Sequence, residues 1–255
     1  MRHLFTIFII VFTLLCVPGA LFAQDTPFDL QVENTFIFSN NENMPHWLAA
    51  QKWGTVNDEQ VQNVFDVSAS GDQHITKYQD LEYGMNAFAN LSADSYACLN
   101  ELFLQYNVAG FSLLAGKRKE VIGDVYTPLS SGSMVISGNA TPIPKISAGI
   151  FDYMSVPFTR DYLQIKGRIS HGWFQGDRHT EDLLLHEKSL YGKANLPYNI
   201  SPYFGLIHEA MWGGVTESGI ESEVTWANFW RIFLAESGGE DATTSSQKNR
   251  LGNHL

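Results

Sequence analysis

The chain has 255 residues, a formal net charge of −11, 17% charged residues and 13% aromatic residues. An acidic chain repels nucleic acid, so this composition excludes a basic DNA-binding or RNA-binding face. Many aromatic and few charged residues favour a β protein that faces lipid or carbohydrate over an ordinary enzyme.

Residues 1–23 have the layout of a secretory signal peptide. A basic start at Arg2 precedes an apolar run over residues 4–17, and Ala23 offers a small residue at a cleavage site. The run is too short to favour a membrane-spanning helix. We therefore expect export, with residues 24–255 as the mature chain. Its net charge is more negative by one unit, because cleavage removes Arg2 and no acidic residue.

Cleavage would remove Cys16 and leave Cys98 as the one cysteine, so no internal disulfide is expected. Stability must then come from strand pairing and side-chain packing. No mature segment reaches the roughly 18 apolar residues of a membrane helix. This excludes a helical membrane protein but not a β-barrel, whose alternating strands hide their hydrophobicity from a window average.

Apolar and polar residues alternate with period 2 through most of the mature chain, which predicts about nine strands. The runs 81–91 and 96–108 are each longer than the ~5–6 residues of a typical strand and match the ~9–11 residues that span a bilayer. In the second run we expect Tyr96 and Cys98 on the same face as Leu102. The expected strands are Leu30–Phe38, Gln60–Ser70, Leu81–Leu91, Tyr96–Val108, Gly110–Arg118, Lys145–Met154, Tyr162–Phe174, Leu183–Asn195 and Ile200–Trp212.

The segments 43–51 and 224–236 differ from this pattern. The first, with Pro45 placed to start a helical turn, predicts a short helical element. The second has apolar residues at helical spacing, although its aromatics would also suit a strand. The fold class expected is therefore all-β: a transmembrane antiparallel β-barrel with a small N-terminal helical element.

The expected strand number is odd, whereas bacterial barrels have even numbers of strands. The chain stops at Leu255 after a Gly/Ser/Thr-rich stretch, without a closing strand that ends on an aromatic residue. An open sheet edge cannot face lipid. We therefore expect that the sequence holds only the N-terminal part of a barrel.

Several catalytic signatures fail on inspection. The stretch His208–Trp212 begins like a zinc-protease motif but has Trp where the second His is required. Ala115–Arg118 lacks the earlier glycine of a phosphate-binding loop, and the chain has no Gly-x-Ser-x-Gly elbow. We expect no enzyme, no metal site and no cofactor.

The stretch from Gly116 to Pro144 carries the strongest functional signal. It opens with the basic cluster Gly116–Glu120, which is either a solvated turn or a cationic lining that faces an acidic polysaccharide. Small hydroxyl residues, glycines, Asn139 and two prolines follow, and such residues make a rigid loop that is rich in hydrogen-bonding groups.

Stretches along nearly the whole mature chain, in order, resemble the Wzi-type capsule assembly family. They are Pro45–Leu48, Gly116–Glu120, Ser131–Met134, Ser137–Pro144, Lys166–Phe174, Leu185–Tyr191, Gly205–His208 and Met211–Gly214. The resemblance implies an outer-membrane barrel of a Gram-negative bacterium that acts as a lectin-like anchor for capsular polysaccharide and not as an enzyme. Family members are much longer, which also implies a missing C-terminal part.

Polysaccharide recognition needs aromatic faces, planar polar groups and, for acidic polymers, cations. We expect the charges from Lys117, Arg118, Lys166 and Arg168, and the stacking and hydrogen bonds from Trp173, His171, Asn139 and Ser131. Alternatively, Trp173 belongs to a bilayer-interface girdle. The cations Lys166 and Arg168 could also pair with Glu101 or Glu82 inside the barrel. The loop residues Ser131 and Asn139 could serve to hold the shape of the loop without binding sugar.

Two other functions remain open at this level. A porin-like channel would share the barrel architecture, and a secreted soluble hydrolase with a β-sandwich would share the strand content. The partners expected for the leading function are surface polysaccharide and outer-membrane lipid, with no nucleic acid, for a protein that is monomeric at full length.

Overall fold

The computed structural model describes residues 28–40, 44–126, 129–130, 132–133, 135–174, 180–216 and 223–236. Nine of its strands form one antiparallel sheet. They are β1 (Phe28–Phe38), β2 (Val61–Thr76), β3 (Gln79–Leu91), β4 (Tyr96–Val108), β5 (Phe111–Lys117), β6 (Lys145–Ser155), β7 (Leu163–Trp173), β9 (Leu184–Ala194) and β10 (Tyr203–Trp212).

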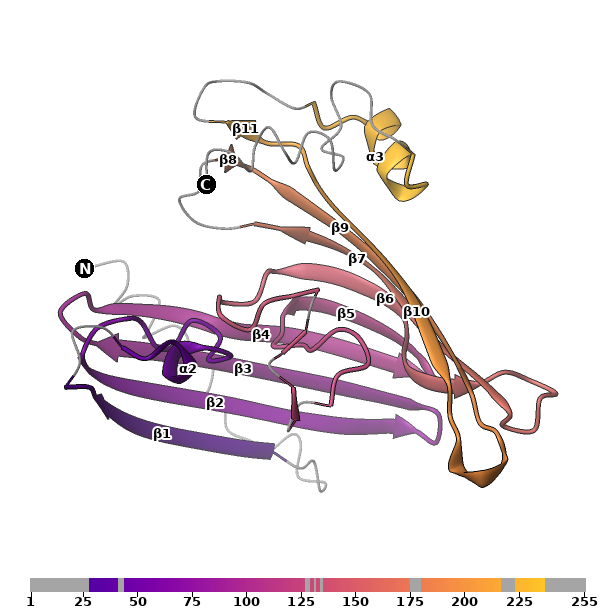
Figure 1. The fold of residues 1–255 in the computed structure, drawn as a ribbon, viewed down its shortest axis with the longest axis horizontal. Coiled ribbons are helices and arrows are strands. Elements are labelled where there is room, and N and C mark those ends of the chain that lie inside the picture. Colours follow the sequence, from indigo (N-terminus) through magenta and orange to yellow (C-terminus); the bar gives the residue numbers. More distant parts are fainter. Residues whose placement is uncertain are drawn as a thin grey trace.

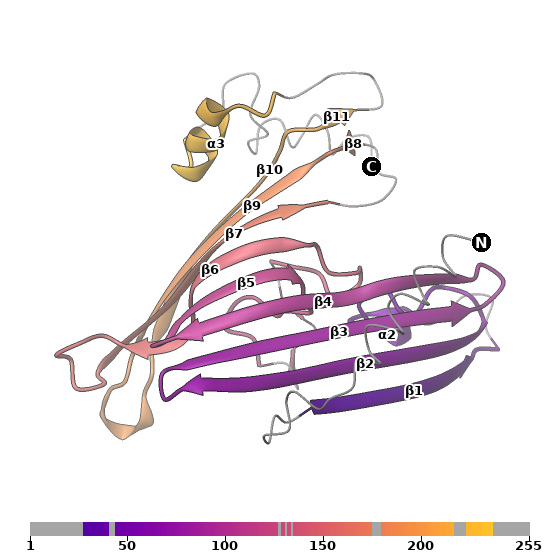
Figure 2. The same ribbon diagram turned by 180° about the vertical axis from the view of Figure 1, so that it is seen from behind.

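Each strand of this sheet pairs with the strands next to it along the chain, in the order β1-β2-β3-β4-β5-β6-β7-β9-β10. The sheet is therefore an up-and-down meander that curves strongly from β1 to β10 (Figures 1 and 2). Among the described residues, β1 and β10 each pair on one side only. The all-β class is confirmed, and every expected strand overlaps a strand of the sheet, although the bounds differ: β2 continues to Thr76, beyond the expected end at Ser70, and β10 begins at Tyr203 instead of Ile200.

The short elements complete the fold. The strands β8 (Thr180–Glu181) and β11 (Val215–Thr216), which the sequence pattern did not indicate, form a separate two-stranded sheet. A 3₁₀ turn, η3 (Pro197–Asn199), precedes β10. Within the described ranges, none of the helices has both the length and the apolar character needed to cross a membrane.

Within the residues that the structure describes, two helices flank the large sheet. The segment 43–51 contains the one-turn helix α2 (His46–Ala49), as expected. The segment 224–236 contains the helix α3 (Trp226–Phe233), so of the two alternatives for this segment the helix is the one observed, and not the strand. The Thr225 side chain accepts a hydrogen bond from the Asn228 N–H at 3.2 Å and caps α3. Helix α2 and the connection from β5 to β6 lie on one side of the sheet, in front of β3 in Figure 1 and behind it in Figure 2.

The two faces of the sheet have the reverse of the burial found in water-soluble proteins. We call the face covered by the described residues between β5 and β6 the inner face, and the opposite one the outer face. Asn86 and Asn90 of β3 lie buried on the inner face, whereas Leu102 and Leu104 of β4 are more than half exposed on the outer face, at 55% and 51%. Polar side chains are thus inside and apolar side chains outside.

One expected face assignment was wrong, because β4 contains a bulge. Asn86 of β3 pairs with Glu101 and Ala87 pairs with Leu99, so Asn100 is an extra residue in β4. An extra residue reverses the alternation on either side of it. Tyr96 therefore points to the inner face, where its ring meets Phe88 at 5.6 Å, and not to the face of Leu102.

The close approach of β4 and β5 requires a glycine, which gives a test of the pairing. At Gly116, with φ of +119°, an added Cβ would lie 2.0 Å from the Leu102 carbonyl oxygen. We expect Gly116→Ala to lower the free energy of unfolding by about 3 kcal/mol, measured by urea denaturation. Gly123→Ala is the control, since its φ of +111° is equally unfavourable but the nearest atom is 3.4 Å away. Equal losses for both variants would contradict a backbone clash.

Candidate functional site

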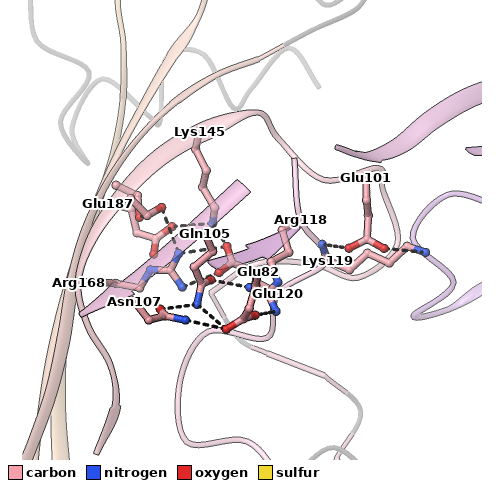
Figure 3. A network of polar contacts seen from close by, with 12 residues as sticks. Glu82, Glu101, Gln105, Asn107, Arg118, Lys119, Glu120, Lys145, Arg168 and Glu187 are labelled. Atoms are coloured by element: carbon pink, nitrogen blue, oxygen red, sulfur yellow. Dashed lines mark hydrogen bonds and ion pairs between the residues drawn. The ribbon is translucent and has the colours of Figure 1, made fainter. Parts of the chain in front are cut away.

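The inner face gathers most of the charged side chains that the sequence pointed to, together with several that it did not. Alternation along β7 turns Lys166 and Arg168 toward this face, and Lys145 reaches it from the start of β6. Arg118 and Lys119 enter it from the chain that follows β5. Acidic and amide side chains lie around Arg118, Lys119, Lys145 and Arg168 (Figure 3), and Lys166 has Asp124 as its acid.

Glu120 is the acid at the centre of the first group (Figure 3). Its two carboxylate oxygens accept from Nη1 and Nη2 of Arg168, both at 3.0 Å, and the Lys145 Nζ lies 2.9 Å from Oε2. The side chains of Lys145, Arg168 and Glu120 are only 4%, 11% and 12% exposed. Burial raises the pKa of Glu120, but the adjacent Lys145 and Arg168 outweigh it and hold that pKa below its usual value.

Glu187 of β9 lies behind this group and is fully buried. The Lys145 Nζ is 3.9 Å from its Oε2, and neither carboxylate oxygen accepts a hydrogen bond within the part of the chain that the structure describes. Ser147 and Ser170 complete the group, with their hydroxyls joined at 2.9 Å and Ser147 accepting from Arg168 at 3.1 Å.

A second group surrounds Arg118. Its Nη2 lies 3.0 Å from Oε2 of Glu82, and its Nη1 donates to the Gln105 side chain. Asn107 donates to Glu82 at 2.8 Å, which places an amide beside the ion pair. Lys119 pairs with Glu101 at 3.6 Å. These groups are more accessible than those around Glu120, because the side chains of Arg118 and Glu82 are 28% and 31% exposed.

Lys166 forms a third pair, with Asp124 of the connection between β5 and β6. Asp124 also accepts from the Tyr153 hydroxyl at 2.6 Å, and the Lys166 Nζ lies 4.7 Å from the Tyr153 ring. Burial raises the pKa of Asp124, but the hydrogen bonds from Lys166 and Tyr153 outweigh it and lower the pKa. Each of the three expected inner cations thus has an acid of this chain as its partner.

The structure does not bring all the expected site residues together. Arg118, Lys166 and Arg168 share the inner face, whereas Lys117 pairs across the ladder with Leu102 and donates to the Leu99 carbonyl oxygen at 2.9 Å. Lys117 therefore lies at the outer face and not in the expected cationic lining. The reason is that Lys117 directly precedes Arg118, and successive side chains of an extended strand point to opposite faces of the sheet.

His171 and Trp173 also lie apart from the inner cations, since they occupy odd positions of β7 and face outward. Their rings are 5.2 Å apart, and His171 lies 6.2 Å from Phe229 of α3. The hypothesis that these two side chains join the cations in one sugar site was wrong for this structure. The outward position of Trp173 agrees with the alternative of a girdle residue.

The loop residues divide in a similar way. The Asn139 side chain accepts from the Gln51 N–H at 2.8 Å, and Trp53 N–H donates to the Gly138 carbonyl at 2.6 Å. Asn139 therefore ties the loop to the chain after α2, which agrees with a shape-holding role. Ser131 lies outside the described residues.

The sequence motifs did not indicate Lys145, Glu120 or Glu187 as members of the ion-pair groups. Lys145 and Glu187 stand at inner-face positions of predicted strands, and a charge at such a position could have indicated a buried ion pair. Glu120 gave no such signal, because its place depends on how the connection folds back on the sheet.

Comparisons with protein-family models, with curated proteins and with solved structures find no match for this chain. The residues and geometry described above are therefore the basis for the proposed function.

The group around Glu120 predicts a pH dependence of stability. Because the folded-state pKa of Glu120 lies below the ordinary glutamate pKa of about 4.5, the stability that its ionised form contributes is fully present above pH 4.5 and is lost as the pH falls through the folded pKa. We expect Glu120→Gln to cost about 3 kcal/mol at neutral pH, since it removes the acid of Arg168 and leaves Lys145 only Glu187, at 3.9 Å. The difference from the unchanged chain should shrink in acid; a difference that stays constant from pH 7 to pH 3 would contradict the pairing.

Proposed function

We propose that the chain is part of an outer-membrane β-barrel that binds and anchors capsular or other surface polysaccharide, without catalysing a reaction. The observation that carries this proposal is the reversed burial of the sheet. A polar inner face with an apolar outer face is the pattern of a barrel wall between lipid and an aqueous lumen.

The dimensions of the strands support the membrane part of the proposal. The longest, β2, has 16 residues, β3 and β4 have 13 each, and β10 has 10, whereas β5 is shorter, with 7. Tilted strands need about 9–11 residues to cross a bilayer. Phe65, Leu104 and Leu113 are between 44% and 51% exposed on the outer face. Exposed apolar surface of this extent requires a partner, and lipid fits the alternation. A closed barrel requires a second pairing partner for both β1 and β10.

The inner face supports the polysaccharide part. Sugar hydroxyls and carboxylates bind planar, charge-assisted donors and acceptors, which the group of Arg118, Glu82 and Asn107 supplies in a partly exposed position. Arg118 is the most exposed of the three inner cations that the sequence indicated. The packed connection 118–144 would restrict a channel, which favours binding over free passage of solutes.

The membrane location predicts the behaviour of the chain in cell fractions. We expect the protein in the outer-membrane fraction, extracted by detergent and not by high salt or alkaline carbonate, because apolar side chains and not charges would hold it there. Recovery in the soluble fraction without detergent would contradict the proposal and favour the secreted hydrolase. A steady conductance in a planar bilayer would favour the porin-like channel instead.

A pair of variants tests the inner face as the polysaccharide site. The double variant Arg118→Gln with Glu82→Gln removes both charges, so it leaves no unpaired ion to destabilise the fold. We expect about ten-fold weaker binding of isolated acidic polysaccharide, from the loss of one charge-assisted interaction.

The matched control is Arg231→Gln, which removes an exposed arginine from α3 on the outer side of the sheet. Its binding should stay within about two-fold of the unchanged chain, since a lone surface charge contributes little. Equal effects of the double variant and the control would contradict a site on the inner face.

A further inference from the structure

The segment Arg118–Asp124, which we call the strap, is held on the inner face mainly by charged side chains. Four of its residues form ion pairs with the strands β3, β4, β6 and β7. Within the described residues, the strap makes no backbone–backbone hydrogen bond to the sheet. Its buried apolar side chain is Ile122, which is 4% exposed. Contacts of this kind can break and form again without any change in the pairing of the strands.

Most of the partners of the strap can be hydrated when it leaves. The side chains of Glu82, Glu101 and Lys166 are between 16% and 31% exposed, so water reaches them already. Water has almost no access to Lys145 and Arg168, the partners of Glu120. A buried cation that loses its acid destabilises the fold strongly. Departure of the strap therefore requires another acid at this one place.

The sheet itself holds such an acid. Glu187 of β9 is fully buried beside Lys145 and Arg168 (Figure 3). Within the described residues, neither of its carboxylate oxygens accepts a hydrogen bond, and the Arg168 Nε is likewise buried without a partner. The Lys145 Nζ lies 3.9 Å from the Glu187 Oε2, so a shift of about 1 Å brings these atoms to hydrogen-bonding distance.

The position of Glu187 explains why the sheet tolerates it. A buried carboxylate without donors is costly, and each unsatisfied group of this kind needs a physical reason. Glu187 gains its donors when Lys145 and Arg168 no longer pair with Glu120. It is thus poorly satisfied while the strap is bound and well satisfied when the strap has left.

We propose that the strap leaves the inner face and returns to it as a unit, and that Glu187 takes over Lys145 and Arg168 while Glu120 is away. The exchange keeps both cations paired in the two states, so the sheet stays folded when its inner face is uncovered. The two states differ in the access of solutes and ligands to that face. The proposal requires neither lipid nor polysaccharide, so it can fail while the proposed function holds.

The reactivity of a thiol under the strap measures how often the strap is released. The parent chain for this test carries Cys98→Ser and Ile122→Cys, and a charged maleimide is added in nonionic detergent at neutral pH. The buried thiol reacts only after the strap opens, so its rate scales with the population of the released state.

A second thiol separates release of the strap from unfolding of the sheet. Val64→Cys, also with Cys98→Ser, is placed at a buried position of β2, a strand that supplies no ion-pair partner of the strap. We expect the Ile122→Cys thiol to react roughly ten-fold faster or more, because the strap opens locally. Equal rates would mean that the strap opens only when the whole sheet unfolds, and would overturn the proposal.

Two acid-to-amide variants of the parent chain give opposite predictions. Glu101 holds the strap through Lys119, so Glu101→Gln should increase the rate of modification about three-fold. Glu187→Gln should decrease that rate about ten-fold, because it removes a charge-assisted interaction that stabilises the released state. An unchanged or increased rate for Glu187→Gln would mean that Glu187 only supports the covered sheet, and would overturn the proposal.

The milder variant Glu187→Asp keeps the test valid if Glu187→Gln fails to fold. It retains the charge but holds the carboxylate one methylene farther from Lys145 and Arg168. We expect the rate of modification to decrease about three-fold, since the weaker pairing disfavours the released state. A rate equal to that of the parent chain, or above it, would contradict the role of Glu187.

Discussion

The pairing of Lys145 and Arg168 with Glu120 is the interaction on which the described structure depends most. Two cations from neighbouring strands are nearly excluded from solvent, and the sheet itself offers them only Glu187, 3.9 Å from Lys145. Removal of one partner from a buried ion pair costs about 3–5 kcal/mol. Glu120 supplies the missing acid from the connection between β5 and β6.

The same complementarity recurs along that connection. Two cations of the connection and then two acids each meet a charge of opposite sign on the wall of the sheet. The resulting pairs are Arg118 with Glu82, Lys119 with Glu101, Glu120 with Arg168, and Asp124 with Lys166. The connection therefore covers the inner face through ion pairs and amide hydrogen bonds. The outer face remains with its apolar side chains exposed, and lipid would be the solvent that suits it.

The strands could be predicted from the sequence because alternation is a local property, and a slip by one residue would turn every side chain to the wrong face. The bulge at Asn100 could not be predicted, since the pattern does not show which residue lacks a partner. For the site, the alternation already separated Arg168 from His171 and Trp173, and the sugar-site hypothesis combined them by residue type alone. The role of Glu120 depends on long-range folding of a loop, which no local pattern reports.

We propose that the outer face contacts lipid and that the inner face contacts water. Nitroxide labels placed one at a time along β4, from Leu102 to Val108, test it in a chain whose Cys98 is replaced by serine. In membranes, labels that face lipid should collide mainly with dissolved oxygen, and these are the labels at Leu102, Leu104 and Tyr106. Labels that face the aqueous side should collide mainly with a water-soluble nickel complex, and these are the labels at Phe103, Gln105 and Asn107. A profile without this two-residue period, or the opposite assignment of the faces, would contradict the account.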